Sequence, residues 1–281
     1  MQRILITGVR GKTGVPLARS LAVRDGVEVL GGSSDPSTIT LDGVVPTAFS
    51  WDEAGHWPSA LTDVDAVFVV RPDRPDAPEL IKALLAITGE RTRVVLLSER
   101  DVDWFEAGSW AHRVEEVVKG SERSWTILRP SWFLQVLADS RFMRDDLMDG
   151  TFPFAGGDAE IAWIDARDIA AVAEHALLED GHDGQTYELS GPEALTSADI
   201  AAQVSEALGH PVERVDLSIG DAVVHLDGFD RELTVITFER VRAGSFAGVT
   251  DTVERVTGQP ARTLGQFLAD GELDADASKA D

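Results

Sequence analysis

The chain has 281 residues, enough for one large domain or for a main domain with an appendage. Its content of 43% hydrophobic and 26% charged residues is ordinary for a globular protein. It holds 25 basic and 49 acidic residues, a net charge of −24, and it has no cysteine, which excludes disulfides, thiolate catalysis and cysteine-bound metals.

The charge and the sequence ends limit the expected partners. An acidic surface repels phosphate groups, so we expect neither a nucleic-acid nor a membrane partner, and no apolar run reaches the length of about 18 residues that spans a bilayer. The six histidines form no His-x-His or His-x-x-x-His pair, so no metal site is expected. A strand pattern begins at once, which leaves no room for a signal peptide and predicts a cytoplasmic protein. The sequence leaves the oligomeric state open.

Apolar, β-branched runs alternate with helical patterns along the first half of the chain. The runs predicted to be strands are 4–7, 27–30, 46–49, 65–70, 94–98 and 125–129. The segments predicted to be helices are 13–24, 79–88 and 111–119. Continuous apolar strands that alternate with helices predict an α/β fold, a Rossmann-type doubly wound parallel sheet covered on both faces.

The pattern loosens after residue 130. A helix is expected at 169–178 with Asp168 as its N-cap, a strand at 187–189, and a helix at 196–208 opened by Thr196 or Ser197. We therefore predict a dinucleotide-binding domain at 1–150 and a small substrate-binding region at 151–269, interleaved with the core. The acidic, polar tail at 270–281 is predicted to be disordered.

A glycine-rich turn follows the first strand. Gly8, Gly11 and Gly14 stand three residues apart and lead into the first helix. Such a turn lets a dinucleotide pyrophosphate approach the backbone and the N–H groups at the helix start. The alternative is a plain tight turn. The remaining predicted contacts in this turn are Arg10, Lys12 and Thr13, of which the two cations either reach phosphates or lie solvated.

The end of the second strand sets the choice between NAD and NADP. Neither an acid nor a base occurs at 31–34, and the hydroxyls of Ser33 and Ser34, with Arg10 or Lys12 nearby, favour the 2′-phosphate of NADP slightly over NAD. Arg71 and Pro130, which end later strands, complete the predicted cofactor-binding set.

Several motifs resemble a known family. The segments 7–14, 64–68, 94–98 and 125–133 resemble the NmrA-like atypical short-chain dehydrogenases. The segments 181–195 and 253–267 resemble their ergot-alkaloid reductase branch, which contains festuclavine-dehydrogenase-like enzymes. The resemblance implies a Rossmann core, an NAD(P) site and a C-terminal substrate region. Family members often carry an arginine near position 34, and this chain does not.

The proton relay of ordinary short-chain dehydrogenases is absent. That relay is Tyr-x-x-x-Lys, whereas the single tyrosine, Tyr187, lies late in the chain, and the relay position reads WAHRVE at 110–115. His112 is the candidate proton donor because a histidine titrates near neutrality. Its alternative is a surface histidine in contact with Glu115. Ser98, which ends a strand, is predicted to touch the nicotinamide or the substrate, with loop capping as its alternative.

Aromatic residues follow the strand at 125–129. Trp132 and Phe133, with Trp163 further on, are predicted to line a site for a flat or polycyclic ligand, and plain core packing is the alternative. Asp165, beside Trp163, is more simply a helix-capping group.

These observations predict an NAD(P)H-dependent oxidoreductase of secondary-metabolite type. Its substrate would be a small or polycyclic compound with an iminium, an activated alkene or a quinone. An iminium carbon accepts hydride without prior protonation, so positioning can suffice without the relay. Two alternatives stay open: an NAD(P)-binding redox sensor or regulator without turnover, and a non-redox cyclase or isomerase on the same scaffold.

Overall fold

The computed structural model describes residues 1–104 and 109–274, and the chain divides into two compact units. Unit 1 contains Met1–Pro130 and Arg167–Glu188, and unit 2 contains Ser131–Ala166 and Leu189–Asp281. The chain therefore passes between the units after residues 130, 166 and 188, and 131–150 belongs to unit 2. Of the predicted tail, 275–281 lies outside the described residues, while Leu273 is buried.

Unit 1 is built on a seven-stranded sheet of order β3-β2-β1-β4-β5-β6-β8. Every pair of its strands with a described register is parallel. The order reverses between β1 and β4, the arrangement of a doubly wound Rossmann sheet, and the predicted fold class is confirmed. The strands are β1 Gln2–Ile6, β2 Val27–Ser33, β3 Val44–Ala48, β4 Ala66–Val70, β5 Arg93–Leu97, β6 Trp125–Pro130 and β8 Gln185–Leu189.

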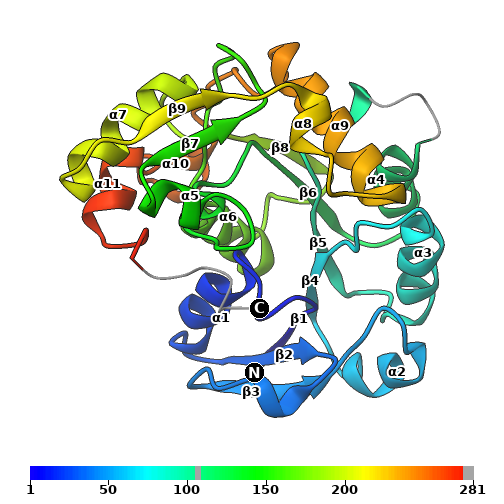
Figure 1. Cartoon of the computed structure of the whole chain (residues 1–281). Helices are drawn as coiled ribbons and strands as arrows, with labels where there is room; N and C mark the ends of the chain where they lie inside the picture. The colour runs from blue at the N-terminus through cyan, green and yellow to red at the C-terminus, as the bar shows by residue number, and fades with distance from the viewer. Residues whose placement is uncertain (105–108, 275–281) are drawn as a thin grey trace. The chain divides into compact units, whose positions relative to one another are not determined.

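Helices cover both faces of this sheet (Figure 1). α3 (Ala77–Ile87) and α4 (Trp110–Lys119) pack on one face through Ile81, Leu84 and Val114, against alternate strand residues such as Val67 and Leu96. α1 (Gly14–Ala22) lies on the opposite face, as does α6 (Ala166–Leu178), and a short helix, α2 (Trp57–Ala60), follows β3. The central strands are apolar on both faces because both faces are buried.

Two predicted boundaries in unit 1 are wrong. β2 continues through Gly31 and Gly32 to Ser33 instead of ending in a loop at 31. A Cβ on Gly31 would lie 2.8 Å from the Val44 side chain, and one on Gly32 would lie 2.9 Å from the Ile6 carbonyl, so these glycines serve close strand packing. α6 begins at Ala166, so Asp168 lies inside its first turn and is not the N-cap, although a carboxylate there still favours the helix dipole.

Unit 2 combines a parallel pair of strands, β7 (Thr151–Phe154) and β9 (Glu213–Asp216), with several helices. Thr196 caps α7 and Thr263 caps α11, each in a reciprocal capping box. Its core contains Phe152, Phe154 and Phe267. The helices are α5 Arg144–Met148, α7 Ser197–Leu208, α8 Ile219–Ala222, α9 Gly228–Arg242, α10 Thr252–Thr257 and α11 Leu264–Ala269.

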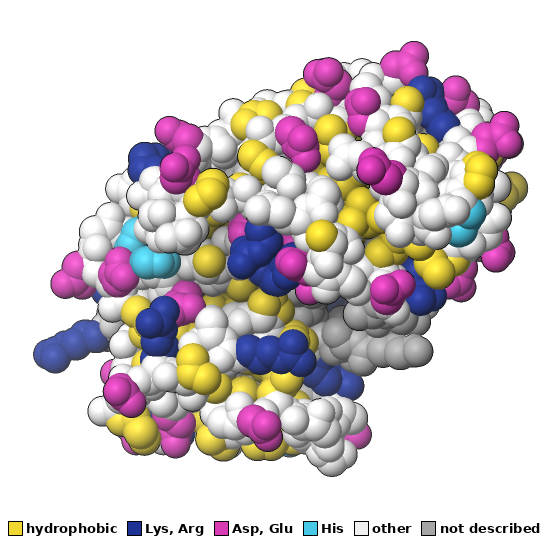
Figure 2. All heavy atoms as spheres, turned by 90° about the vertical axis from the view of Figure 1, so that its left-hand side faces the viewer, with side chains coloured by type: hydrophobic (Ala, Val, Ile, Leu, Met, Phe, Trp, Pro, Cys, Tyr) yellow, Lys and Arg dark blue, Asp and Glu magenta, His cyan; other side chains and the backbone are white. Residues whose placement is uncertain are grey.

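Acidic side chains are distributed over the face drawn in Figure 2, among polar and apolar ones, rather than gathered into one patch. Among the described residues, no helix has both the length and the apolar composition needed to cross a membrane. In the same residues, no group of three or more histidine or acidic side chains is arranged to hold a metal ion.

Candidate active site

The glycine turn lies between β1 and α1, at the point where the strand order reverses. Thr7 anchors its start, because its hydroxyl accepts the Val70 N–H at 2.9 Å and so ties β1 to the neighbouring strand β4. The Gly11 N–H donates to the Gly8 carbonyl at 3.1 Å, and Val15 N–H donates to the Gly11 carbonyl at 3.0 Å. The turn is thereby closed on itself, directly before the N-terminus of α1.

The glycines of the turn have different reasons to be glycine. A Cβ on Gly14 would lie 1.9 Å from the Gly8 carbonyl oxygen, so packing inside the protein requires a glycine there, whereas one on Gly8 would lie 3.0 Å from the Val70 side chain, a tight contact. A Cβ on Gly11 would meet nothing nearer than the Gly8 oxygen at 3.4 Å. The bare backbone at Gly11 therefore leaves room for a ligand to approach, as a pyrophosphate cradle requires.

The end of β2 carries a carboxylate that is turned back on its own loop. Asp35 accepts hydrogen bonds from the Ser37 backbone N–H at 3.1 Å and the Ser37 hydroxyl at 2.6 Å, and these bonds lower the pKa of Asp35. The Ser33 hydroxyl donates to the Asp35 carbonyl at 3.0 Å, whereas Ser34 is exposed. Both bonds from Ser37 end on the same oxygen, Oδ1, of this exposed carboxylate.

Arg10 reaches from the glycine turn to the same loop. Its guanidinium donates to the Thr38 hydroxyl at 2.9 Å. Thr38 belongs to a short 3-10 helix, Pro36–Thr38, that Asp35 caps. Arg10 and Ser34 therefore lie on the two loops that border the end of β2, where the ribose of a bound dinucleotide is held in this fold.

Arg71, which follows β4, is held by its surroundings. Its guanidinium pairs with Glu99 at 2.6 Å and Asp73 at 3.4 Å and lies 4.5 Å from the centroid of the Trp110 ring. Buried guanidinium groups of this kind are anchored by both charge and stacking. Arg71 links the ends of β4 and β5 to the first turn of α4.

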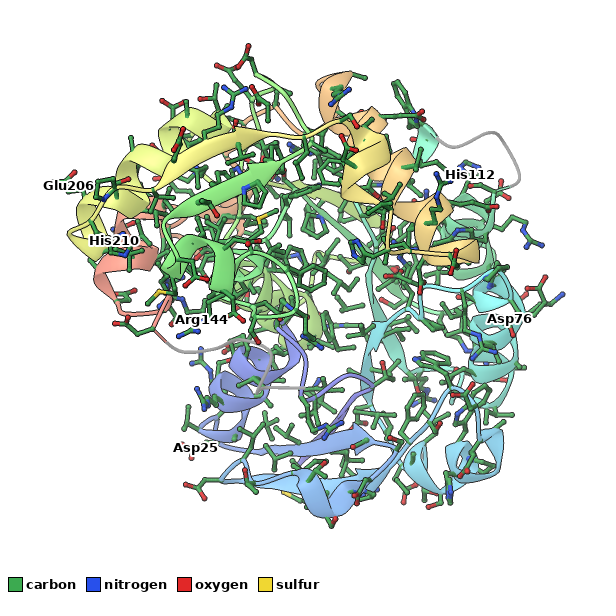
Figure 3. The ribbon with its side chains drawn as sticks, viewed as in Figure 1. Asp25, Asp76, His112, Arg144, Glu206 and His210 are labelled. Carbon is green, nitrogen blue, oxygen red and sulfur yellow. The ribbon has the colours of Figure 1, made fainter. Side chains whose placement is uncertain are left out.

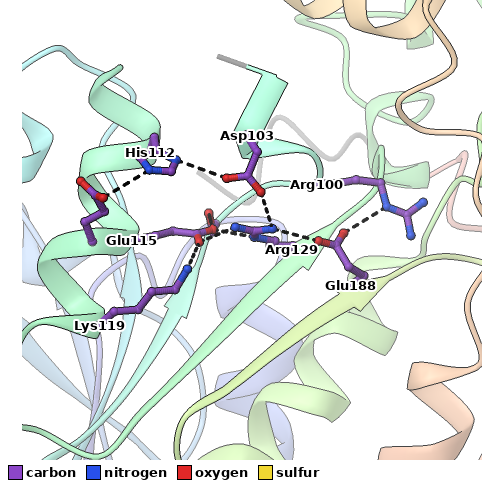
Figure 4. Close-up of polar contacts among 9 residues, drawn as sticks. Arg100, Asp103, His112, Glu115, Lys119, Arg129 and Glu188 are labelled. Atoms are coloured by element: carbon purple, nitrogen blue, oxygen red, sulfur yellow. Dashed lines mark hydrogen bonds and ion pairs between the residues drawn. The ribbon is translucent and has the colours of Figure 1, made fainter. Parts of the chain in front are cut away.

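Glu115 is the centre of a buried polar network (Figure 4). This α4 residue is 1% exposed and receives a bidentate pair of hydrogen bonds from Arg129 of β6, at 2.8 and 2.7 Å. The Ser98 hydroxyl, directly after β5, donates to it at 2.7 Å, and Lys119 donates at 2.9 Å. A buried carboxylate is stable only with such partners.

The network continues along the carboxyl ends of the strands. Arg129 also pairs with Asp103 and with Glu188 of β8, both at 3.3 Å, and Glu188 pairs with Arg100 at 3.4 Å. Burial by itself would raise the pKa of Glu115, but the hydrogen bonds from Arg129, Ser98 and Lys119 outweigh it and hold that pKa below its ordinary value. Glu115 is therefore ionised at neutral pH, and its carboxylate can accept hydrogen bonds but cannot donate them.

The candidate catalytic residues Ser98 and His112 lie in the same network without touching one another. His112, labelled on α4 in Figure 3, has Nδ1 3.2 Å from Asp103 and Nε2 3.4 Å from Glu116. The expected alternative contact with Glu115 is wrong, since Glu115 points into the buried network and Glu116 takes that role. Asp103 joins the two residues, because it contacts both His112 and Arg129.

The single tyrosine belongs to another part of unit 1. The Tyr187 hydroxyl is 2.8 Å from His182 Nδ1, within β8 and the segment before it. Neither residue contacts the Glu115 network through a described bond. Tyr187 thus has the place of a sheet residue, in line with the absence of a Tyr-x-x-x-Lys relay.

The predicted substrate residues Trp132, Phe133 and Trp163 all lie in unit 2. The rings of Trp132 and Trp163 meet edge to face with centroids 5.3 Å apart, and Trp132 also contacts Phe154 and Phe238. Phe133 is half-buried and forms an isolated bridge with Ile164. The structure brings the two tryptophans together in an aromatic cluster and leaves Phe133 outside it.

The sequence predictions missed Arg129, Glu188 and Arg100, and named Glu115 only as a surface contact. The sequence did contain a signal for the pair of Glu115 and Arg129. Glu115 falls on the apolar stripe of its helix with Ala111, Val114 and Val118, and a carboxylate on such a stripe needs a buried cation. No local pattern shows that this cation is Arg129.

A cavity of about 650 Å³ is lined by residues of α3 and α4 and the segment after α4. None of the predicted site residues lines it. The candidate site residues of unit 1 therefore lie at the carboxyl ends of the strands and do not line this cavity.

Comparison with known proteins gives relatives along nearly the whole chain. The chain is 32% identical to the NAD(P)H azoreductase of Xenophilus azovorans over 94% of this chain and 96% of the relative. It is 34% identical to the (4-alkanoyl-5-oxo-2,5-dihydrofuran-3-yl)methyl phosphate reductase of Streptomyces griseus, over 95% and 97% of the two chains. No family model matches the chain.

The chain belongs to the NmrA-like atypical short-chain dehydrogenases. The predicted likeness to the ergot-alkaloid branch and the predicted class, an atypical short-chain oxidoreductase, are confirmed. Among solved structures, the Escherichia coli NADPH-dependent quinone oxidoreductase in complex with NADPH superposes with a TM-score of 0.79 at 22% identity, over 95% of this chain and 99% of that one. That likeness concerns the fold.

Proposed function

We propose that this protein is an NADPH-dependent reductase of a small, flat, electron-poor compound. The observation that carries the proposal is the bare backbone at Gly11, between the closely packed Gly8 and Gly14, at the switch point of a Rossmann sheet. Support comes from the relatives, which are named as reductases of an azo compound and of an unsaturated oxo-furan. The substrate class that we infer is an azo compound, a quinone, an activated alkene or an iminium.

The residues present fit a dinucleotide. Gly11 leaves the room, the N-terminus of α1 favours a negative charge, and Thr13 and Lys12 lie beside it. A bound NADPH would supply a hydride for the reaction. We infer that the chain contributes binding and orientation, with Arg71 and Pro130 at the ends of β4 and β6 as further contacts.

We infer a preference for NADPH over NADH from the loops at the end of β2. Arg10 is held over this loop by Thr38, Ser34 is exposed, and Ser33 lies at the end of the strand. Asp35, a carboxylate that favours NAD, has one of its two oxygens bonded to Ser37. A guanidinium beside the exposed Ser34 suits a 2′-phosphate.

The polar network argues for a substrate that needs no proton from the protein. The Ser98 hydroxyl donates its one hydrogen bond to the ionised Glu115. It can therefore accept a hydrogen bond from a ligand but cannot donate one to it. Both ring nitrogens of His112 face carboxylates. We therefore propose positioning roles for Ser98 and His112, with protons taken from water.

The predicted substrate contacts Trp132, Phe133 and Trp163 remain part of the proposal. Aromatic side chains offer flat surfaces that suit conjugated ligands. Trp132 is half-buried, so part of its ring system remains accessible.

The test is the oxidation of NADPH and of NADH, followed by absorbance, with menadione, an azo dye, an enone and a cyclic iminium as acceptors. We expect turnover with at least one acceptor and a lower KM for NADPH than for NADH. Arg10→Gln should raise the KM for NADPH about tenfold and leave that for NADH unchanged, whereas the control Arg19→Gln on the exposed side of α1 should alter neither.

Three results would contradict parts of this proposal. No binding of either cofactor would reject the dinucleotide site itself. Binding without turnover of any acceptor would favour the regulatory alternative. Product formation without cofactor would favour the cyclase or isomerase.

A further inference from the structure

The indole N–H of Trp163 has no hydrogen-bond partner among the described residues, although the residue is only 3% exposed. Leaving a buried donor unpaired costs free energy, and buried indole groups ordinarily have an acceptor. Such an orphaned donor in a native protein calls for an explanation, and a ligand acceptor is one.

The main chain on both sides of Trp163 is fixed. The Ala162 N–H donates to the Phe246 carbonyl and the Ile164 N–H donates to the Trp132 carbonyl, both at 2.8 Å. On a third side, Gly191 lies so close that a Cβ there would come within 1.9 Å of the Trp163 carbonyl oxygen. The main chain that carries the indole is therefore held in place on three sides.

The surroundings of the indole are aromatic. Trp132 meets Trp163 edge to face, Phe154 lies 6.4 Å away between centroids, and Phe238 lies 5.9 Å from Trp132. Trp132 and Phe238 are half-buried, so the cluster extends to the accessible surface of unit 2 through these rings. A flat aromatic molecule is the ligand that such rings pack against best.

We propose that the Trp163 indole N–H donates a hydrogen bond to an oxygen or nitrogen acceptor of a planar aromatic substrate that packs on Trp132 and Phe238. The inference rests on the proposed reductase function and narrows its substrate class. A quinone or conjugated carbonyl oxygen and an azo nitrogen each carry a lone pair for this donor. An iminium nitrogen has no lone pair, so the site disfavours an iminium.

The test replaces Trp163 by benzothienylalanine, which keeps the bicyclic shape and lacks the N–H. The probes are menadione and methylnaphthalene, which share a ring system but differ in the carbonyl acceptors. Binding to the full chain saturated with NADP⁺ is measured by equilibrium dialysis. We expect the Kd of menadione to rise about tenfold and that of methylnaphthalene to stay the same. The same replacement at Trp132 is the control and should not weaken menadione selectively.

Two results would overturn the inference: an unchanged Kd for menadione, or an equal loss for both probes, which would indicate packing alone. If the variant does not fold, the wild-type protein with ¹⁵N-labelled indoles decides. Its Trp163 N–H resonance should move downfield with menadione and not with methylnaphthalene, and an unmoved resonance would reject the hydrogen bond. Because these readouts are equilibrium binding, they are separate from the turnover assay, whose failure would reject the proposed function instead.

Discussion

The glycine turn after β1 and the Glu115 network after β5 and β6 lie at the same edge of one parallel sheet, yet they are built by opposite means. The turn consists of backbone from a single short segment, and its geometry depends on side chains being absent at Gly8 and Gly14. The network consists of buried charges from separate segments, joined through Arg129 and Glu115.

The contrast explains which part of the family chemistry this chain retains. The turn leaves the backbone at Gly11 open to a ligand. The central carboxylate of the network is ionised and accepts a hydrogen bond from Ser98, so it has no proton of its own to supply. Cofactor holding and proton supply are thus separable properties of one sheet edge.

The largest expected effect separates two glycines of the turn. Gly14→Ala places a Cβ 1.9 Å from the Gly8 oxygen and should lower the free energy of unfolding by more than about 4 kcal/mol. Gly11→Ala should cost less than about 1 kcal/mol but raise the Kd for NADPH at least about tenfold. Urea denaturation and cofactor titration measure both. A stable Gly14→Ala protein, or a Gly11→Ala protein with normal affinity, would break the distinction.

Glu115→Ala should be nearly as costly. It leaves Arg129 and Lys119 without their carboxylate, and breaking a buried pair in this way costs about 3–5 kcal/mol. The control is Glu116→Ala, one residue along the same helix, whose exposed pair with His112 should contribute less than about 0.5 kcal/mol. Urea denaturation measures the free energy of unfolding of both variants. Similar decreases would show that the buried network stabilises the protein no more than the exposed pair does.

Acid should weaken the network in a defined direction. The pKa of Glu115 is lower in the folded protein than in the unfolded chain, where it is about 4.3. Its stabilising contribution is therefore complete above that value and is lost as the pH falls through the folded pKa. The free energy of unfolding should decrease below about pH 4.5, and Glu115→Gln should show a smaller decrease. Parallel curves for the two proteins would contradict this assignment.

His112→Gln tests whether this edge of the sheet supplies a proton to the substrate. Because both ring nitrogens face carboxylates and the proposed acceptors take protons from water, kcat with menadione should change less than about threefold. Steady-state kinetics across the neutral pH range measures it. A loss near a hundredfold, together with a lost alkaline limb of the pH profile, would instead make His112 the general acid.

The smallest effect is expected for Tyr187→Phe. Its hydroxyl bonds to His182, in the segment before β8, so stability should fall by only about 1 kcal/mol, and we expect kcat not to change. Thermal denaturation and the menadione assay suffice. A marked loss of kcat would show instead that Tyr187 takes part in catalysis.

Much of the fold followed from local patterns. β4 reads as five consecutive apolar residues, of which the first four are buried, and the capping box at Thr196 marks the start of α7. The end of β2 was missed because Gly31 and Gly32 are typical of loops, and only their tight contacts with Val44 and Ile6 explain them as strand residues. Asp168 was misplaced because a carboxylate suits both an N-cap and a first helical turn.

The amino-acid sequence by itself determined the α/β class, the glycine turn, the missing tyrosine relay and the family, since each depends on residues close together in the chain. Only the tertiary structure decided that Glu115 meets Arg129 and Ser98, that Arg10 reaches Thr38, and that the Trp163 N–H has no acceptor among the described residues. These features depend on which segments the fold brings together and on what each buried polar group can reach. The hydrophobic periodicity and the motif spacing of the sequence contain neither kind of information.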